Sequence, residues 1–284
     1  MTVSGSPPRS FGTRLHTALA DRGHLCAGID PHSSLLHDWG LGDDVAGLER
    51  FALSAVEGLA PSVSVVKPQS AFFERFGSRG VAVLERVITE SRAAGALVLL
   101  DVKRGDIGTT SQAYADAYLD PASPLASDAV TASPYLGFGS LTPMIDTARR
   151  HGAGVFVLAF TSNKEGPEVQ HAGAAGGRSV GGRILDHLCG LNDGAEPLGS
   201  FGAVVGATLA DTGESFAING PVLAPGYGAQ GGSAADIARI FGAAAHNVLA
   251  STSRELLRHG PDVTRLRDAA RRGNDELADL RSRG

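Results

Sequence analysis

The sequence predicts an α/β protein with the fold of a (β/α)8 or TIM barrel, built as a single domain. Eight short apolar segments recur along the 284 residues, and helix-like segments lie between most of them. Each apolar segment is nearly continuous rather than alternating, as expected for parallel strands buried on both faces. The chain is also long enough for a barrel of about 250 residues with flanking helices at both ends.

The expected elements follow one another in the order that a barrel requires. The strands are predicted at residues 24–30, 63–67, 96–103, 128–133, 154–160, 201–208, 221–226 and 246–251. The clearest helix-like segments are 43–60, 80–95, 110–119, 140–152 and 233–245. Several of them end at or near glycine, which commonly terminates helices. Repeated alternation of strand and helix is typical of this architecture.

Three segments flank or interrupt the repeat. Residues 10–22 are predicted to form a helix across the bottom of the barrel, and residues 1–9 are expected to be disordered, which leaves 10–284 as the domain. The polar, glycine-rich segment 162–182 is expected to be a lid over the top face or a mobile linker, and we favour the lid. Residues 261–283 are predicted to form a closing amphipathic helix, whose inward residues are Val263, Leu266, Ala270, Leu277 and Leu280.

Composition narrows the class of protein. A net charge of −5 and a pI of about 6.0 argue against a nucleic-acid partner. No apolar run is long enough to cross a membrane and the first residues do not form a secretory signal, so we expect a cytoplasmic protein. Cys26 and Cys189 lie in apolar stretches and are predicted to be reduced, packed thiols.

Metal ligation is not expected. The nine histidines are scattered without H-x-x-x-H spacing, and the chain has no C-x-x-C motif. His32, two residues after Asp30, is the only histidine near the expected mouth of the barrel, and we interpret it as a loop residue.

The most informative motif is D-x-K-x-x-D at the end of the third expected strand, formed by Asp101, Lys103 and Asp106. Side chains alternate along a strand, so Asp101 and Lys103 should face the same way, about 6.6 Å apart along the backbone. Of 25 basic residues only Lys67, Lys103 and Lys164 are lysines. An ammonium group can give up a proton, whereas a guanidinium does not readily do so. Lysines at the ends of two strands therefore indicate positions where a group that can release a proton is needed.

Lys67, Asp101, Lys103 and Asp106 form an array of alternating charge that sums to zero. Desolvated together, such groups keep one another ionised, because each carboxylate lies near an ammonium. The array can stabilise a developing carbanion and place a proton donor beside it. The alternative interpretation is a salt-bridge cluster at the surface end of a strand.

A second motif predicts a phosphate site. The segment 224–233, APGYGAQGGS, follows the seventh strand and surrounds Gln230 with small residues whose backbone amides can wrap an anion. Ser253 and Arg254 open a helix after the eighth strand, where barrels commonly bind phosphate, and Arg254 offers a bidentate clamp. Taken alone, the glycine-rich segment could be an ordinary flexible turn.

These motifs together resemble a known family. VLLDVKRGDIGTT (98–110) resembles the signature of the orotidine 5′-phosphate decarboxylases, and GID (28–30), VVKPQ (65–69), PGYGAQGG (225–232) and SR (253–254) follow in the family's order. The resemblance covers about residues 10–255, and the long insertion at 162–200 resembles the family's longer bacterial branch. It implies decarboxylation of orotidine 5′-monophosphate (OMP) to UMP, the last step of de novo pyrimidine biosynthesis, by a homodimer without metal or cofactor.

The resemblance also implies roles for the charged array. Lys67, Asp101 and Lys103 would form a network that Asp106 of the partner subunit completes. Lys103 would protonate C6 of the pyrimidine as carbon dioxide leaves. Asp101 would lie beside the substrate carboxylate and destabilise it relative to the carbanion-like transition state.

Further positions would bind the substrate. Asp30 and Lys67 would contact the ribose with Thr110 of the partner subunit, and Ser162 would contact the pyrimidine unless Thr161 or Asn163 takes that role. Gln230, Gly231 and Arg254 would hold the phosphate, so that binding there contributes to catalysis. The complete set implied by the resemblance is Asp30, Ile107, Thr110, Ser162, Gln230, Gly231, Ser253 and Arg254.

Two alternatives remain open at this point. A metal-dependent sugar-phosphate lyase or aldolase, such as a hexulose-phosphate synthase, shares the D-x-K-x-x-D barrel but needs carboxylates that hold a divalent ion. Here Lys67 stands at the second strand end, where a second acid is needed. A non-catalytic protein that binds a phosphorylated ligand would gain little from four buried charges, because burying them costs desolvation energy.

Overall fold

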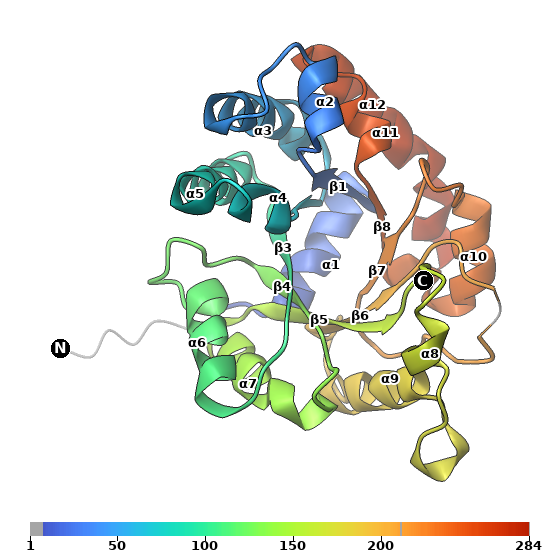
Figure 1. Cartoon of the computed structure of the whole chain (residues 1–284). Helices are drawn as coiled ribbons and strands as arrows, with labels where there is room; N and C mark the ends of the chain where they lie inside the picture. Colours follow the sequence, from blue (N-terminus) through green and yellow to red (C-terminus); the bar gives the residue numbers. More distant parts are fainter. Residues whose placement is uncertain (1–7, 211, 284) are drawn as a thin grey trace.

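The computed structural model describes residues 8–210 and 212–283 and shows a closed barrel of parallel strands (Figure 1). Each strand pairs with the next, and β8 pairs with β1. The predicted TIM barrel is therefore confirmed, with each strand inside or overlapping its expected segment. The strands are β1 (Leu25–Ile29), β2 (Val65–Pro68), β3 (Leu97–Arg104), β4 (Ala129–Ala132), β5 (Gly154–Phe160), β6 (Phe201–Val205), β7 (Val222–Pro225) and β8 (Val248–Thr252).

Helices surround the barrel and cover its outer face (Figure 1). The α-helices are α1 (Phe11–Arg22), α2 (Ser33–Asp38), α3 (Val45–Leu59), α4 (Ala71–Glu74), α5 (Gly77–Ala93), α6 (Gly108–Leu119), α7 (Thr142–His151), α8 (Pro167–Gln170), α9 (Val180–Leu191), α10 (Ala234–Phe241), α11 (Arg254–Leu257) and α12 (Val263–Glu276). The 3-10 helices are η1 (Ala60–Ser62), η2 (Phe138–Leu141), η3 (Ala175–Gly177), η4 (Gly242–Asn247) and η5 (Ala278–Arg283).

Local sequence explains where the outer helices begin and which face they bury. The side chain of Asp44 caps α3 by accepting a hydrogen bond from the Gly47 amide at 2.8 Å. Ser233 and Asp236 form a reciprocal capping box at the start of α10. In α3 the buried residues recur at helical spacing and face the strands, as the hydrophobic pattern requires.

Helix α1 closes the bottom of the barrel, as predicted. Its residues Phe11, Leu15 and Leu19 pack in one cluster with inward side chains of the strands, among them Leu99 and Phe156. The rings of Phe11 and Phe156 meet edge to face at 5.9 Å. The barrel is therefore filled from below, and its free space lies at the carboxyl ends of the strands.

The prediction of one continuous helix over 261–283 is wrong. Helix α12 ends at Glu276, and η5 follows it. Leu277 and Leu280 are nevertheless buried as expected, because residues three apart share a face in a 3-10 helix. Leu266 and Ala270 are buried as well, whereas Val263 is only partly covered.

The polar segment 162–182 is structured rather than continuous loop: it contains α8 and η3 and runs into α9. Helix α9 had no counterpart in the sequence prediction, because its first turn contains two glycines, Gly181 and Gly182, which are weak helix formers. Gly181 lies against the ring of Phe160, where a Cβ atom would come within 2.4 Å of the ring. Cys189 on α9 is exposed, so the expectation that both thiols are packed holds only for Cys26.

The expected disordered tail, residues 1–9, lies outside the described residues apart from positions 8 and 9. Over the described part of the chain, no helix is both long enough and apolar enough to span a membrane.

Candidate active site

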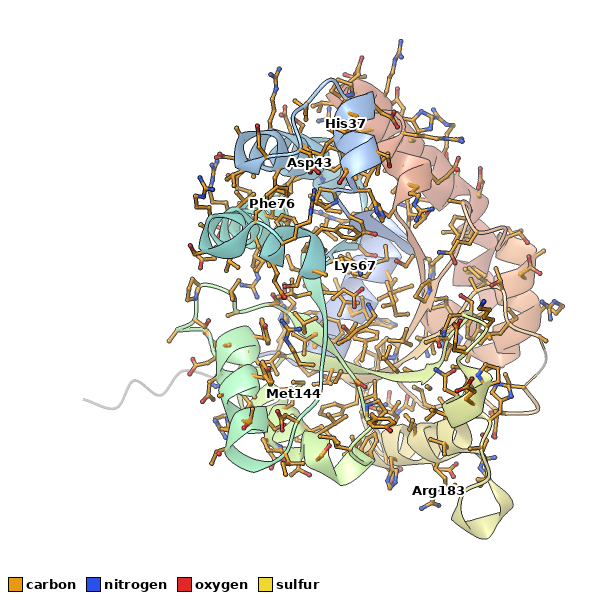
Figure 2. All side chains as sticks on the ribbon, in the orientation of Figure 1. His37, Asp43, Lys67, Phe76, Met144 and Arg183 are labelled. Carbon is orange, nitrogen blue, oxygen red and sulfur yellow. The ribbon has the colours of Figure 1, made fainter. Side chains whose placement is uncertain are left out.

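A cavity of about 440 Å³ opens at the carboxyl ends of the strands. Figure 2 shows Lys67, labelled, inside the ring of strands. Eight of the residues proposed from the sequence line this cavity, although they come from different strands and loops: Asp30, Lys67, Asp101, Lys103, Ser162, Gln230, Ser253 and Arg254. Barrel enzymes carry their active sites at this end, so the cavity is the candidate active site.

Asp101 lies between two ammonium groups at the floor of the cavity. Lys103 Nζ is 2.6 Å from both carboxylate oxygens of Asp101, and Lys67 Nζ is 3.4 Å from Oδ2. Lys67 Nζ is also 3.9 Å from Oδ1 of Asp30. The side chains of Lys67 and Asp101 are each 7% exposed, whereas that of Lys103 is 46% exposed and reaches toward the open space.

These contacts decide the charge state of the cluster. Burial acts to raise the pKa of Asp101, but Lys67 and Lys103 outweigh it and lower that pKa to about 2. Burial likewise opposes the charged form of Lys67, yet Asp30 and Asp101 raise the pKa of Lys67 well above its usual value. Asp101 and Lys67 are therefore both ionised at neutral pH.

The backbone beneath this cluster is irregular. The pairing of β3 with β4 shifts register between Leu100 and Arg104, and Lys103 has φ = +45°. A left-handed conformation costs a non-glycine residue about 1–2 kcal/mol. The Lys103 amide donates a hydrogen bond to Thr131 Oγ1 at 2.9 Å, and the Thr131 hydroxyl donates to Asp101 Oδ1 at 2.7 Å. The ammonium of Lys103 thus reaches Asp101 from a bulge rather than from a regular strand.

Thr131 is a residue that the sequence analysis missed. It stands near the end of β4, is 1% exposed, and lines the cavity. A single threonine within a buried strand gives no recognisable pattern, so only its contact with the bulged segment of β3 shows its importance.

The expected phosphate loop lies on the opposite side of the cavity, between β7 and α10. Gly226, Gly228 and Gly231 have φ of +102°, +75° and +90°, values that favour glycine. Arg254 lines the same cavity and begins α11. Gly231 belongs to the loop but does not line the cavity.

Some polar atoms at the cavity are buried without a hydrogen-bond partner. Within the described residues these include Oδ1 of Asp30, Oγ1 of Thr252 and Oγ of Ser253. Unsatisfied buried polar atoms are few in native proteins, so their concentration here indicates a place for a polar ligand.

Hydrogen bonds in the turn after β5 distinguish Thr161, Ser162 and Asn163, the three candidates for contact with the pyrimidine. The Thr161 hydroxyl donates to Asn163 Oδ1 at 2.6 Å, and the Asn163 amide donates to Glu165 Oε2 at 3.0 Å. Gln170 on α8 accepts from the Thr161 amide and donates to its hydroxyl oxygen, both at 2.7 Å. All three residues line the cavity, but neither set of hydrogen bonds includes Ser162.

Asp106, Ile107 and Thr110 lie outside the cavity formed by their own chain. Asp106 accepts a hydrogen bond from the Ile107 amide at 2.7 Å, and Ile107 is 62% exposed. The neighbouring loop after β4 carries Tyr135 and Leu136, which are 79% and 53% exposed. The two loops touch, because Gly105 packs against Ser133.

Comparison with known proteins agrees with this geometry. The model of the orotidine 5′-phosphate decarboxylase / HUMPS family matches residues 23–269. An orotidine 5′-phosphate decarboxylase of Nocardioides sp. is 73% identical over 271 residues, which cover 94% of this chain and 98% of the relative. The chain belongs to the orotidine 5′-phosphate decarboxylase / HUMPS family.

Further relatives place it among the decarboxylases of that family. The orotidine 5′-phosphate decarboxylase of Streptomyces coelicolor is 64% identical, over 92% of this chain and 95% of the relative. A crystal structure from Streptomyces avermitilis, described as that of an orotidine 5′-phosphate decarboxylase, superposes with a TM-score of 0.96 at 60% identity, over 99% of both chains. The OMP decarboxylase of Leishmania donovani has a TM-score of 0.73 at 31% identity, over 96% of this chain and 99% of the other. The resemblance found in the sequence is confirmed.

The sequence analysis assigned no role to two other residues that line the cavity, His32 and Tyr227. His32, interpreted as a loop residue, stands directly before α2 without a capping hydrogen bond from its side chain, and it also lines the cavity, where its ring packs against Phe72 at 4.3 Å. Burial and the nearby Arg254 lower the pKa of His32. Tyr227 also lines the cavity. Among residues 8–210 and 212–283, no three His, Cys, Asp or Glu side chains gather as a metal-binding group.

Proposed function

We propose that this chain converts orotidine 5′-monophosphate to UMP and carbon dioxide. The observation that carries the proposal is the buried carboxylate of Asp101, held between Lys67 and Lys103 beside a cavity whose far side is a glycine-rich loop with Arg254. Removal of a carboxylate without an electron sink needs preorganised charge, and the cluster supplies it.

The decarboxylation step would centre on Lys103. The bond between C6 and the carboxylate carbon breaks, carbon dioxide leaves, and the electron pair stays on C6. The ammonium of Lys103 donates its proton to C6 and forms the new C–H bond. Asp101 holds Lys103 in place through two contacts of 2.6 Å and lies beside the departing carboxylate, which its charge destabilises.

The remaining cavity residues would bind the rest of the nucleotide. Asp30, whose Oδ1 atom lacks a hydrogen-bond partner among the described residues, and Lys67 would bind the ribose hydroxyls. Ser162 would contact the pyrimidine, because Thr161 and Asn163 already bond to each other. The phosphate would be held by Gln230, Gly231, Ser253 and Arg254.

A second copy of the chain would complete the site. We propose a homodimer in which Asp106, Ile107 and Thr110 of each subunit reach the cavity of the other. Two observations support this arrangement. The three residues lie outside their own cavity, and the adjoining loops expose the large apolar side chains of Ile107, Tyr135 and Leu136, which is typical of an interaction surface.

The family name also includes the hexulose-phosphate synthases, which are the chief alternative. A metal-dependent lyase needs a second acid at the end of β2, but Lys67 occupies that position and points to Asp101. A binding protein without catalysis remains the other alternative, and the buried charge cluster disfavours it.

The test is the change in ultraviolet absorbance when purified protein is mixed with OMP, with and without EDTA. Rapid conversion to UMP that EDTA does not affect is the expected result. Loss of activity on chelation would favour the metal-dependent alternative. Binding of OMP without conversion would favour the non-catalytic one.

A further inference from the structure

The loop between β7 and α10 has only one large buried side chain. Tyr227 is 6% exposed, whereas residues 229–231 at the tip of the loop are exposed. The hydrogen bonds from Gly228 to Gly232 and from Gly232 to Gly226 join the loop to itself. They maintain its shape but do not fix its position relative to the barrel. Tyr227 is therefore the side chain that can anchor the loop.

Tyr227 lines the active-site cavity, and its hydroxyl extends behind the loop to the C-terminal helix. Its hydroxyl donates a hydrogen bond to Oε2 of Glu276 at 2.7 Å. Glu276 is the last residue of α12, and the two residues also border a second cavity of about 670 Å³ behind the loop. Figure 1 shows α12 on the same side of the barrel as β8. Tyr227 thus connects the loop between β7 and α10 to α12, a helix outside the barrel.

The position of Glu276 is electrostatically unfavourable for a helix. A carboxylate at a helix C-terminus faces the negative end of the helix dipole, which costs about 0.3–1 kcal/mol. Within the described part of the chain no ion pair includes Glu276. Its hydrogen bond to Tyr227 is therefore the contact that offsets this unfavourable position. Burial and Glu276 raise the pKa of Tyr227, so the tyrosine hydroxyl remains a donor.

We infer that Tyr227 and Glu276 are positioning residues for recognition of the substrate phosphate. Their hydrogen bond sets where the loop lies, and thereby lets Gln230 and Arg254 approach one phosphate group from two sides. The nature of the ligand rests on the proposed function, whereas the anchoring of the loop does not. Affinity for the phosphate then depends on a residue at the end of α12, outside the cavity.

The test compares UMP with uridine, which differ only by the phosphate. Tyr227→Phe removes the hydroxyl and keeps the ring, and Glu276→Ala removes the acceptor. Calorimetry should show UMP binding weakened about tenfold in each variant, the factor that loss of one hydrogen bond to a charged group produces. Uridine binding should not change. Glu276→Gln retains an acceptor and should restore most of the affinity for UMP.

Two controls make the result specific to this contact. Asp275→Ala removes a neighbouring exposed carboxylate from the same helix end and should leave UMP binding unchanged. The double variant Tyr227→Phe/Glu276→Ala should be no weaker than either single variant, because both remove the same bond. Equal loss of affinity for UMP and uridine, or effects that add in the double variant, would overturn the inference.

A measurement without ligand separates this inference from the proposed function. Amide hydrogen exchange over residues 226–233 should be faster in Tyr227→Phe than in the unmodified chain. If the unmodified chain neither binds UMP nor converts OMP but exchange still rises, the proposed function fails and the anchor stands. Unchanged exchange would refute the anchor whatever the activity.

Discussion

Asp101→Asn keeps the size of the side chain but removes the negative charge between Lys67 and Lys103. In the folded chain the pKa of Asp101 falls from the usual 3.8 to about 2. At about 1.4 kcal/mol per pKa unit, this difference corresponds to roughly 2 kcal/mol of folding stability. Because the group is nearly buried, solvent screening removes little of that contribution.

The pH at which this stability appears follows from the direction of the shift. The unfolded chain binds the proton more tightly than the folded chain, so stability rises with pH through this range. The contribution is complete above about pH 5 and disappears as the pH falls toward 2. The asparagine variant lacks it and also leaves Lys67 buried with only Asp30 nearby, at 3.9 Å.

The assay is urea unfolding of both proteins at several pH values from 7 to 3. The free energy of unfolding of Asp101→Asn should be lower by at least about 2 kcal/mol at pH 7, and the gap should narrow as the pH falls. Asp38→Asn, which alters an exposed carboxylate, serves as the control and should show no such trend. A gap for Asp101→Asn that stays constant from pH 7 to 3 would refute the reasoning.

Three further results are expected. Lys103→Ala should reduce kcat by a factor on the order of 10²–10⁴ or more while UMP still binds, and near-normal turnover would remove its role as proton donor. Arg254→Ala should weaken UMP binding about 10- to 100-fold by calorimetry, so an unchanged affinity would count against the phosphate clamp. In the native protein Ellman's reagent should titrate Cys189 alone, because burial raises the pKa of Cys26 to about 12; immediate reaction of both thiols would contradict this.

The strands were predictable because both of their faces are buried. Each forms a run of apolar residues that a helix covered on one side does not need, and every such run proved to be a strand. Helix α9 was not predictable in the same way. Gly181 and Gly182 at its start are required by close packing against Phe160 and Glu214, and such contacts cannot be seen in the sequence.

In the candidate site, too, some residues could be predicted from the sequence and others could not. Lys67, Asp101 and Lys103 could be found because charged residues at the ends of apolar strands are conspicuous. Thr131 and Tyr227 could not, since their importance depends on hydrogen bonds to residues far away in the sequence. The bulge at Lys103 was likewise hidden, because the sequence argument assumed a regular strand.

The filled bottom of the barrel has a consequence for the release of products. Phe11, Leu15 and Leu19 of α1 fill the bottom of the barrel, and the cavity opens at the other end, so in the proposed reaction carbon dioxide would leave through the same mouth by which the nucleotide enters. The released gas would therefore stay beside the new carbanion until it passed the bound nucleotide. In the proposed mechanism, prompt protonation of C6 by Lys103 would prevent recapture of carbon dioxide, and the direction of the reaction would then depend on a proton rather than on a separate exit.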